Sequence, residues 1–279
     1  MSTDWEQMID DYLRSLAAAG QRRATLTLRR NHLNRIAKCI GCAPQEVTAE
    51  ALVNWFGRQT HWKLETRRAY RSAARKFFQW AYATGRVGVD LSDALPVVHQ
   101  ITPPPRPTPD AVWDAALGAA DLRSRLMLRL AAEAGLRRGE VARLQTGDVL
   151  DGVDGPRLVV DGKGGKTRVV PISDSLARAV QAGAAGHTPG APEHGYLFPA
   201  PGGGHLTVQY VGLLITRLMP DGYTMHGLRH RFATRAYRGT RNLRAVQVLL
   251  GHASIVTTER YTAVDDAEIR AAMVAAIGD

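Results

Sequence analysis

A stretch of 36 residues in the C-terminal part of the chain carries side chains that could act on a phosphate group. They occur in three short motifs, namely His226-Gly-Leu-Arg229-His230, Leu249-Leu-Gly-His252 and Tyr261. A second arginine lies far upstream, in Ala134-Gly-Leu-Arg137-Arg-Gly-Glu140. Two arginines can hold a phosphate through charge-assisted hydrogen bonds, histidines can transfer protons, and a tyrosine can attack the phosphorus. This combination predicts covalent chemistry on a DNA or RNA backbone.

Helical spacing indicates which of the downstream side chains can meet. His226 and Arg229 are three residues apart and should share one face of a helix. His230 lies about 100° further round from Arg229 and is expected to pack or to cap. Gly251 should close the helix that precedes His252.

Arg137 and two lysines are weaker candidates when each is considered alone. A helix would place Arg137 on the same side as Glu140, but most helical arginines are solvated, and Arg138 is an equally good surface candidate. Lys163 and Lys166 lie in a glycine-rich turn, where the backbone can approach a phosphate closely. An exposed turn with lysines for solubility is the commoner outcome, and the turn does not match the Walker A pattern.

Metal binding and thiol chemistry are the competing interpretations for the histidines and cysteines. A zinc site at His226, His230 and His252 would lack an obvious carboxylate or thiol ligand, and the pattern is not H-E-x-x-H. Cys39 and Cys42 have C-x-x-C spacing but follow a helix rather than a strand. We therefore expect two ordinary thiols, no metal and no cofactor.

Composition favours a polyanionic partner. The net charge is +10, and 45% of the residues are hydrophobic, which is enough to fill real cores. The N-terminus is acidic and lacks an apolar signal region, and no apolar run is long enough to span a bilayer. We expect a cytosolic protein that binds nucleic acid and no membrane; a merely soluble basic protein is the alternative.

Residues 1–85 are predicted to form helices joined by short turns, because apolar residues recur there at helical spacing. Thr48 should cap one of these helices, and another should run from Thr66 to Tyr82. The apolar positions expected in the helical core include Tyr12, Leu28, Leu33, Val53, Tyr70, Phe77 and Tyr82.

A proline-rich segment divides the chain. Thr102-Pro-Pro-Pro-Arg-Pro-Thr-Pro109 can form neither helix nor central strand and should run extended between two domains. The chain beyond it should be helical to about Leu144, with Thr108 as the cap and Pro109 at the first helical position. Residues 157–161 and 167–172 are strand-like on either side of the glycine-rich turn, which predicts a β-hairpin. Helices should return after Ser173.

Basic residues are concentrated in the first part of the chain. Those that follow one helix are Arg67, Arg68, Arg71, Arg75 and Lys76, and Arg22 and Arg23 begin another. Solvated helix faces would explain them without any function. Because few acidic residues interleave, we favour contact with DNA phosphates, and we add Lys166 to the same candidate set.

Five motifs, taken in order, resemble the tyrosine recombinase family, which includes phage integrases of the lambda type and the Xer recombinases. They are Gly-Leu-Arg137-x-x-Glu140, Gly-Lys163-Gly, His226-x-x-Arg229-His230, Leu-Gly-His252 and Tyr261, within residues of about 108–265. The resemblance implies a mainly α, two-domain DNA clamp with a small β-hairpin. It comprises a helical core-binding domain (1–100), a linker (101–107), a catalytic domain (108–264) and a tail helix (265–279). The tail is expected to dock on a neighbouring protomer, as in the family's tetramers, and folding back on its own domain is the alternative.

The resemblance also implies a site-specific recombinase that cleaves and rejoins DNA through a 3′-phosphotyrosyl link. The catalytic residues that it assigns are Arg137, Lys163, His226, Arg229, His252 and Tyr261. Tyr261 would attack the phosphate with His226 as its base, and Lys163 would protonate the 5′-hydroxyl leaving group. The two arginines and His252 would hold the non-bridging oxygens. The covalent link retains the bond energy, so neither ATP nor a metal is required.

Two positions depart from the family pattern. Gly227 stands where the family usually has a polar residue, and Arg231 stands where a small hydroxyl residue is common. Neither position is catalytic, so local DNA contact, not the chemistry, is expected to differ. Lys166 is a rival for the lysine role, and Lys163 is preferred because it aligns with the Gly-Lys-Gly motif.

Partners and biological role follow from the same resemblance. It implies double-stranded DNA, a homo-tetramer on synapsed DNA formed from a monomer in solution, and the bacterial cytoplasm as location. The chain starts directly in the core-binding helices, with no room for an arm-binding domain. We favour a phage or mobile-element integrase over a Xer-type resolvase. A type IB topoisomerase and a non-catalytic regulator of the same fold are the remaining alternatives.

Overall fold

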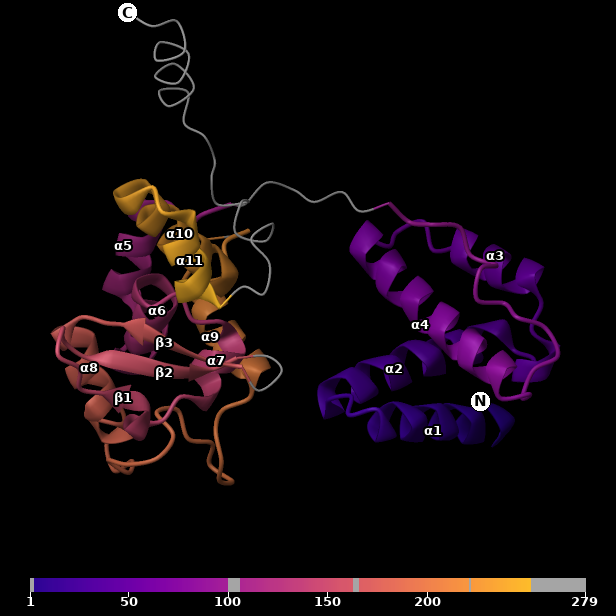
Figure 1. The fold of residues 1–279 in the computed structure, drawn as a ribbon, viewed down its shortest axis with the longest axis horizontal. Helices are drawn as coiled ribbons and strands as arrows, with labels where there is room; N and C mark the ends of the chain where they lie inside the picture. The colour runs from indigo at the N-terminus through magenta and orange to yellow at the C-terminus, as the bar shows by residue number, and fades with distance from the viewer. Residues whose placement is uncertain (1–2, 100–105, 163–165, 221, 252–279) are drawn as a thin grey trace, which may run out of the picture. The chain divides into compact units, whose positions relative to one another are not determined.

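The computed structural model describes residues 3–99, 106–162, 166–220 and 222–251, and the chain divides into two compact units (Figure 1). Unit 1 is Met1–Pro103 and unit 2 is Pro104–Asp279. No helix among the described residues is long and apolar enough to cross a membrane. The site is built from unit 2.

Unit 1 is a helical bundle with an aromatic core. Its elements are α1 (Thr3–Ala18), α2 (Arg23–Ile40), a 3-10 turn (Pro44–Glu46), α3 (Ala49–Gly57) and α4 (Leu64–Ala83). Trp5 of α1 stacks on Phe77 of α4 with ring centroids 5.6 Å apart, and Tyr12 meets the edge of the same ring. Thr48 caps α3 as predicted, since its hydroxyl accepts a hydrogen bond from the Ala51 amide.

Three of the positions expected in the core of unit 1 are exposed instead. Tyr82 is 50% exposed because Ala81, not Tyr82, continues the buried stripe of Phe77 and Phe78 along α4. Leu28 and Val53 likewise lie on solvent-facing sides of their helices. The free thiols of Cys39 and Cys42 lie at and just after the end of α2, where the Cys42 carbonyl accepts a hydrogen bond from the Trp5 indole.

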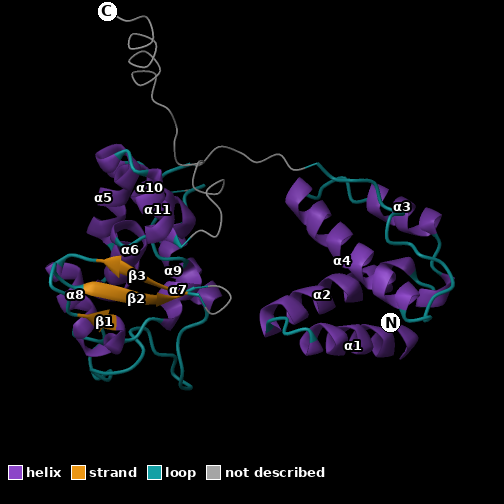
Figure 2. Ribbon diagram, in the orientation of Figure 1, coloured by secondary structure: helices purple, strands orange, loops and turns teal. Residues whose placement is uncertain are grey.

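Unit 2 combines seven described helices with a small antiparallel sheet (Figure 2). The helices are α5 (Asp110–Ala119), α6 (Leu122–Glu133), α7 (Arg138–Arg143), α8 (Asp174–Gln181), α9 (Val208–Arg217), α10 (Met225–Thr240) and α11 (Leu243–Leu250). The strands are β1 (Val149–Leu150), β2 (Arg157–Asp161) and β3 (Thr167–Pro171), in the order β1-β2-β3. Two 3-10 turns, Thr146–Asp148 and Ala184–Gly186, join these elements.

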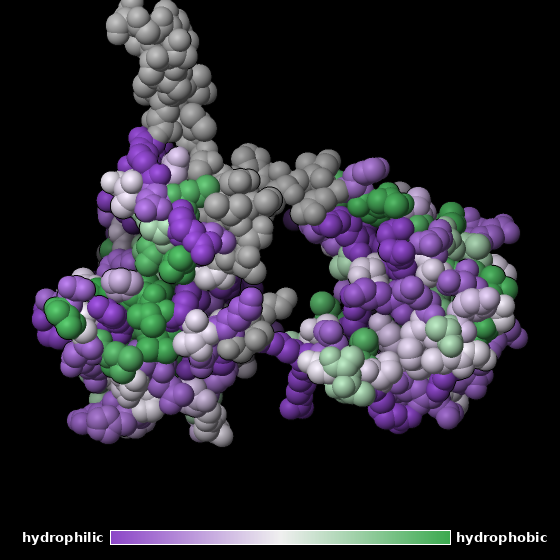
Figure 3. Space-filling view, in the orientation of Figure 1, coloured by the Kyte–Doolittle hydropathy of each residue, from purple (hydrophilic) through white to green (hydrophobic). Residues whose placement is uncertain are grey.

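The predicted β-hairpin is confirmed. Asp161 pairs with Thr167 and Arg157 pairs with Pro171, so the strands flank the glycine-rich turn in the expected register. The short strand β1, which no sequence pattern indicated, pairs with the outer edge of β2. In Figure 3 apolar side chains gather over this part of unit 2. Val169 of β3 is one of the large apolar residues exposed on the sheet.

The start of unit 2 differs from the prediction. Pro109, not Thr108, is the N-cap residue of α5, and no side chain caps that helix. The Thr108 amide instead donates to the Gly227 carbonyl at the start of α10, 3.1 Å away. This tertiary pairing buries the Thr108 side chain, whose hydroxyl has no hydrogen-bond partner among the described residues. The helical stretch that follows is three separate helices.

The core of unit 2 is centred on α6. Met127, Leu128, Leu130 and Ala131 of this helix have no exposed surface. A stripe of charged residues, Arg125, Arg129 and Glu133, leaves one side of α6 open to solvent. The helix packs against α10 and also contacts α7, α8 and α9. It therefore provides a rigid support for α7 and α10, which carry the site.

Candidate active site

Helix α10 presents two of the predicted catalytic side chains. His226 and Arg229 are one turn apart in its first two turns, as their spacing predicted, and both line one pocket. His226 is exposed, whereas Arg229 is only 1% exposed. The ring of His230 is inclined at 70° to that of His226, with centroids 4.2 Å apart, which agrees with a packing role.

Arg137 reaches the same pocket from a sharp turn between α6 and α7. Gly135 adopts a left-handed conformation with φ of 65°, and a Cβ there would lie 2.5 Å from the Phe232 ring of α10. Only glycine fits this close approach. Arg137 was predicted inside a helix, but it is the N-cap residue of α7 and has an extended backbone. The turn at Gly135 separates α6 from α7, so no helix runs through Arg137. Its side chain is 39% exposed.

Glu140 connects the arginines. Its carboxylate accepts hydrogen bonds from the amide and the guanidinium of Arg137, both at 2.8 Å, and its oxygens lie 2.8 and 3.0 Å from two nitrogens of Arg168. Arg229 lies 3.8 Å away. The carboxylate is 3% exposed, so three guanidinium groups surround one buried negative charge and the cluster is net positive.

The pKa of Glu140 reflects these contacts. Burial alone would raise the pKa, but hydrogen bonds from Arg168 and from the Arg137 amide, with the charge of Arg168, lower it to about 2. The carboxylate is therefore ionised at neutral pH. A folded-state pKa below the ordinary value of 4.5 means that this group stabilises the fold above that value, and that the contribution is lost as the pH falls towards 2.

Arg229 anchors three segments to one another. Its guanidinium donates to the carbonyl of Gly135 and, at 2.6 Å, to the carbonyl of Leu250. Leu250 is the last residue of α11, and Gly251 closes that helix in a left-handed conformation, as predicted. The turn before α7, the helix α10 and the end of α11 thus meet at this one side chain.

Arg168 is a member of the cluster that the sequence analysis missed. It lies on β3 with its side chain 8% exposed, and its Nε also donates to the Leu249 carbonyl, 2.9 Å away. The sequence held one signal, because Arg168 and Val170 are two residues apart in a predicted strand and must point to the same face. Val170 is apolar and fully buried, so this is the covered face of the strand.

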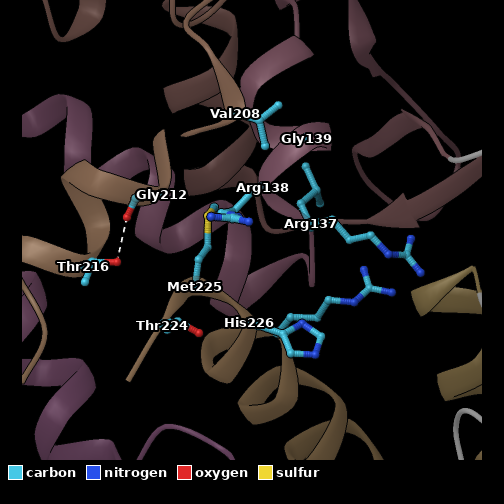
Figure 4. Close-up of a pocket in the computed structure, with 11 residues that line it drawn as sticks. Arg137, Arg138, Gly139, Val208, Gly212, Thr216, Thr224, Met225 and His226 are labelled. Atoms are coloured by element: carbon cyan, nitrogen blue, oxygen red, sulfur yellow. Dashed lines mark hydrogen bonds between the residues drawn. The ribbon is translucent and has the colours of Figure 1, made fainter. Parts of the chain in front are cut away.

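The pocket formed by these elements has a volume of about 430 Å³ (Figure 4). Arg137, His226, Gly212 and Thr216 all line it, and in Figure 4 the side chains of Arg137 and His226 lie on the side opposite to Gly212 and Thr216 of α9. The Arg138 guanidinium lies against Gly212, where a Cβ would be only 2.6 Å from its nitrogen. A basic pocket of this size can take an anionic group.

Gly227 explains one departure noted in the sequence. A Cβ at this position would lie 2.8 Å from the Thr108 hydroxyl and 3.3 Å from the Arg106 carbonyl. The chain therefore enters unit 2 directly against the helix that carries His226. Arg231, the second departure, forms an ion pair with Asp110 of α5 at 2.6 Å.

The remaining predicted residues lie elsewhere. Lys163, His252 and Tyr261 fall outside the described residues, while Lys166 is exposed at the start of the β3 side of the hairpin turn. The basic candidates on α2 and α4 belong to unit 1, and most of those on α4 have protein partners. Their partners are Gln59 for Arg67, Glu65 for Arg68, Leu95 for Arg71 and Asp93 for Arg75.

The family model described as "Phage integrase family" matches residues 110–268. The XerC tyrosine recombinase of Rhodospirillum centenum is 36% identical over 214 residues, which cover 70% of this chain and 60% of that protein. The XerC of Methylobacterium nodulans is 37% identical and is covered to 68%, and the XerD of Ralstonia nicotianae is 34% identical and covered to 69%. The chain spans less than two thirds of several such relatives, and only 42% of the XerC of Bradyrhizobium diazoefficiens.

Solved structures agree in fold. A lambda integrase (75-356) dimer bound to a COC' core site superposes with a TM-score of 0.72 at 20% identity, covering 93% of this chain and 96% of that one. The XerH site-specific recombinase bound to its difH substrate gives 0.69 at 19% identity, with 90% and 78% covered. The mainly helical fold with a small antiparallel sheet is therefore the fold of these enzymes. By its sequence and its fold, the chain belongs to the phage integrase family, the tyrosine recombinases.

Proposed function

We propose that the protein is a site-specific DNA recombinase that cleaves and rejoins DNA through a 3′-phosphotyrosyl intermediate. One observation carries the proposal: Arg137, His226 and Arg229 line one pocket, and the buried, ionised Glu140 holds Arg137 in place. A phosphodiester gains negative charge on its way to the pentacovalent transition state. Fixed guanidinium groups stabilise that charge without reorganising during the reaction.

The chemical roles follow from the side chains. Tyr261 attacks the phosphorus, and the exposed imidazole of His226 takes its proton, because an ordinary tyrosine with a pKa of about 10 is a poor nucleophile at neutral pH. The P–O bond to the 5′ oxygen breaks, and Lys163 protonates the leaving hydroxyl. Arg137, Arg229 and His252 bind the non-bridging oxygens. A 5′-hydroxyl of another strand then attacks the phosphotyrosine and releases Tyr261.

The test is covalent capture from a pool of duplexes with randomised sequence and a nick in one strand. Cleavage beside the nick releases a short fragment, so the protein remains attached to the DNA. We expect an adduct that survives a denaturing gel, and the sequence of the captured DNA identifies the core site. Absence of any adduct across the pool would overturn the proposal.

The same adduct should form in EDTA without nucleotide. Every role in the proposed reaction belongs to a side chain, and the phosphotyrosine conserves the energy of the broken bond. Adduct yield on the captured duplex, measured with EDTA and with added Mg²⁺, should be equal within a factor of about two, since only phosphate screening differs. A strict need for Mg²⁺ in the cleavage step would contradict this mechanism.

Lys163→Ala should slow cleavage by about two to four orders of magnitude, which is the usual contribution of a general acid. A sulfur at the 5′ bridging position should restore the rate, because a thiolate leaves without a proton. Lys166→Ala is the matched control from the same turn: it should weaken DNA binding, but at saturating protein it should cleave both substrates at the wild-type rate. If the sulfur rescues Lys166→Ala instead, the assignment within the turn is reversed.

The surrounding roles are further proposals. Arg22 and the basic residues of α2 and α4, Arg23 and Lys76 among them, contact the DNA backbone, as does Lys166 of the hairpin turn. Four protomers join on two synapsed sites. The tail, residues 265–279, docks on a neighbouring protomer. We propose integration or excision of a phage or mobile element as the biological reaction. The XerC and XerD relatives favour a second candidate, a resolvase of chromosome or plasmid dimers.

The two biological candidates differ in the sites that they recombine. A plasmid with two directly repeated copies of the captured site distinguishes them. A resolvase should delete the segment between identical copies, while an integrase should require two different sites, one from each partner DNA.

A further inference from the structure

Arg168 has no part in the proposed chemistry, yet it donates three hydrogen bonds within the cluster. Its guanidinium forms a two-pronged ion pair with the Glu140 carboxylate, and its Nε donates to the Leu249 carbonyl. The side chain extends from β3, so it joins the hairpin to α7 and to the end of α11. These three elements are far apart in sequence.

We propose that Arg168 is a positioning residue, which fixes Glu140 and the C-terminal end of α11 and thereby holds Arg137 and Arg229 in the geometry that binds the reacting phosphate. The inference rests on the function proposed above. It adds a residue to that site which contacts neither the DNA nor the reacting atoms.

The two carboxylate oxygens of Glu140 determine where the Arg137 guanidinium can lie. Each oxygen is shared, since Oε1 accepts from both Arg137 Nη1 and Arg168 Nη1, and Oε2 accepts from the Arg137 amide and Arg168 Nη2. A bidentate guanidinium fixes the plane of a carboxylate. With Arg168 present, Glu140 can offer Arg137 only one position. Without it, the carboxylate would be free to turn toward Arg137 and to draw that guanidinium away from the phosphate.

Arg168 also binds the C-terminal end of α11. The last carbonyls of a helix lack intrahelical partners and carry partial negative charge. Two arginines bind them here: Arg168 binds Leu249 and Arg229 binds Leu250. Gly251 follows in a left-handed conformation, and a Cβ on it would lie 2.8 Å from Cδ of Arg168. Arg168 therefore packs against the residue at which the chain leaves α11.

The burial of Arg168 favours a positioning role over direct contact with DNA. The side chain of Arg168 is 8% exposed, whereas that of Arg137 is 39% exposed and lines the pocket. Arg168 is not among the residues that line the pocket, whereas Arg137 and Arg229 are, and its Nε, Nη1 and Nη2 already donate to the Leu249 carbonyl and the Glu140 carboxylate. Loss of Arg168 should therefore reduce the rate of cleavage and leave the affinity for DNA unchanged.

Four variants test the proposal: Arg168→Met, Arg168→Lys, the double variant Glu140→Gln/Arg168→Met, and the control Arg157→Met from the other strand of the hairpin. Arg157 is 42% exposed and pairs only with Asp154 among the described residues. Each is measured on the duplex captured by the wild-type protein, by single-turnover cleavage, by the dissociation constant and by thermal denaturation.

We expect Arg168→Met to slow cleavage about a hundredfold, the effect of a displacement of about 1 Å in a catalytic group. The dissociation constant should stay within about twofold of wild type, within the ordinary context dependence of such values. Arg168→Lys keeps the positive charge but loses the planar group that binds both oxygens of Glu140, so it should have an intermediate rate. The double variant removes the Glu140–Arg168 ion pair and leaves Arg229 as the remaining buried charge of the cluster, so it should not regain the rate. Arg157→Met should match wild type in every respect.

Two readouts exclude a merely structural role. Glu140 faces Arg137, Arg168 and Arg229, and loss of Arg168 removes the largest influence that lowers the pKa of Glu140. The loss of cleavage caused by protonation of Glu140 should therefore occur at higher pH in Arg168→Met than in wild type. In the double variant, which has no carboxyl group at position 140, only the pH dependence set by His226 as the base should remain. Hydrogen exchange at residues 243–251 should be faster in Arg168→Met than in Arg157→Met. This exchange does not depend on catalysis.

The outcomes separate the two proposals. If the wild-type protein captures no DNA, the proposed function fails, while faster exchange in α11 would still support the contact described for Arg168. If wild type cleaves and Arg168→Met cleaves equally fast, the positioning role is wrong and the function stands. Equal losses of affinity and rate would also overturn it, because they would make Arg168 a DNA contact. If Arg168→Met does not fold, the rate and pH dependence of Arg168→Lys decide.

Discussion

Tyr261→Phe is expected to abolish covalent attachment of the protein to DNA while DNA binding remains intact. The substitution keeps the aromatic ring and removes only the nucleophilic oxygen, so nucleophilic attack is lost while the bulk of the side chain is kept. The adduct on a nicked duplex should fall below detection, and the dissociation constant should be unchanged in a gel-shift assay on the same duplex.

Tyr237→Phe is the matched control. Tyr237 packs beside the small cluster of Ala233, Val246 and Leu250, with the Arg241 guanidinium 5.9 Å from its ring centre. It is the next tyrosine along the chain towards the N-terminus, and its variant should form the adduct normally. An adduct that persists in Tyr261→Phe and disappears in Tyr237→Phe would move the nucleophile to α10.

Arg137→Ala and Arg229→Ala should each slow cleavage by about two to four orders of magnitude, as loss of a charge partner in the transition state does. Affinity for DNA should fall much less in both. The structure predicts that the two variants differ in stability. Arg137 is 39% exposed and Glu140 retains Arg168, so Arg137→Ala should lower the free energy of unfolding by no more than about 1 kcal/mol.

Arg229→Ala should be clearly less stable. Arg229 is 1% exposed, and its loss leaves the Gly135 and Leu250 carbonyls without this donor, at about 1–3 kcal/mol for each buried group left unsatisfied. Thermal denaturation measures the loss of stability, and single-turnover cleavage and affinity measurements on the same variants give the effects on catalysis and on DNA binding. Equal losses in binding and cleavage would make either arginine a plain phosphate anchor, and equal stability of the two variants would contradict the anchoring role of Arg229.

The sequence predicted those parts of the fold that depend on local patterns. The hairpin follows from β-branched runs around a glycine-rich turn, and its register is as expected. The helix with His226 and Arg229 on one side follows from their spacing. Thr48 caps α3 because an N-cap hydroxyl acts on amides only three residues away.

Contacts between distant segments could not be predicted in this way. Thr108 has the sequence of a helix cap, but its amide pairs with Gly227, more than a hundred residues away. Arg137 looks helical by its spacing from Glu140, but the turn at Gly135 is set by the Phe232 ring. Arg168 looks like any strand arginine until Glu140 and Leu249 are placed beside it.

The contact between Thr108 and Gly227 makes these two positions interdependent. Since a Cβ at position 227 would lie 2.8 Å from the Thr108 hydroxyl and 3.3 Å from the Arg106 carbonyl, a larger residue cannot be introduced there alone without displacing the entry to unit 2. A smaller residue at position 108 would remove the closer of these two contacts. A larger residue at position 227 should therefore be tolerated better after the change at position 108 than before it, so the order of the two substitutions determines which route stays open.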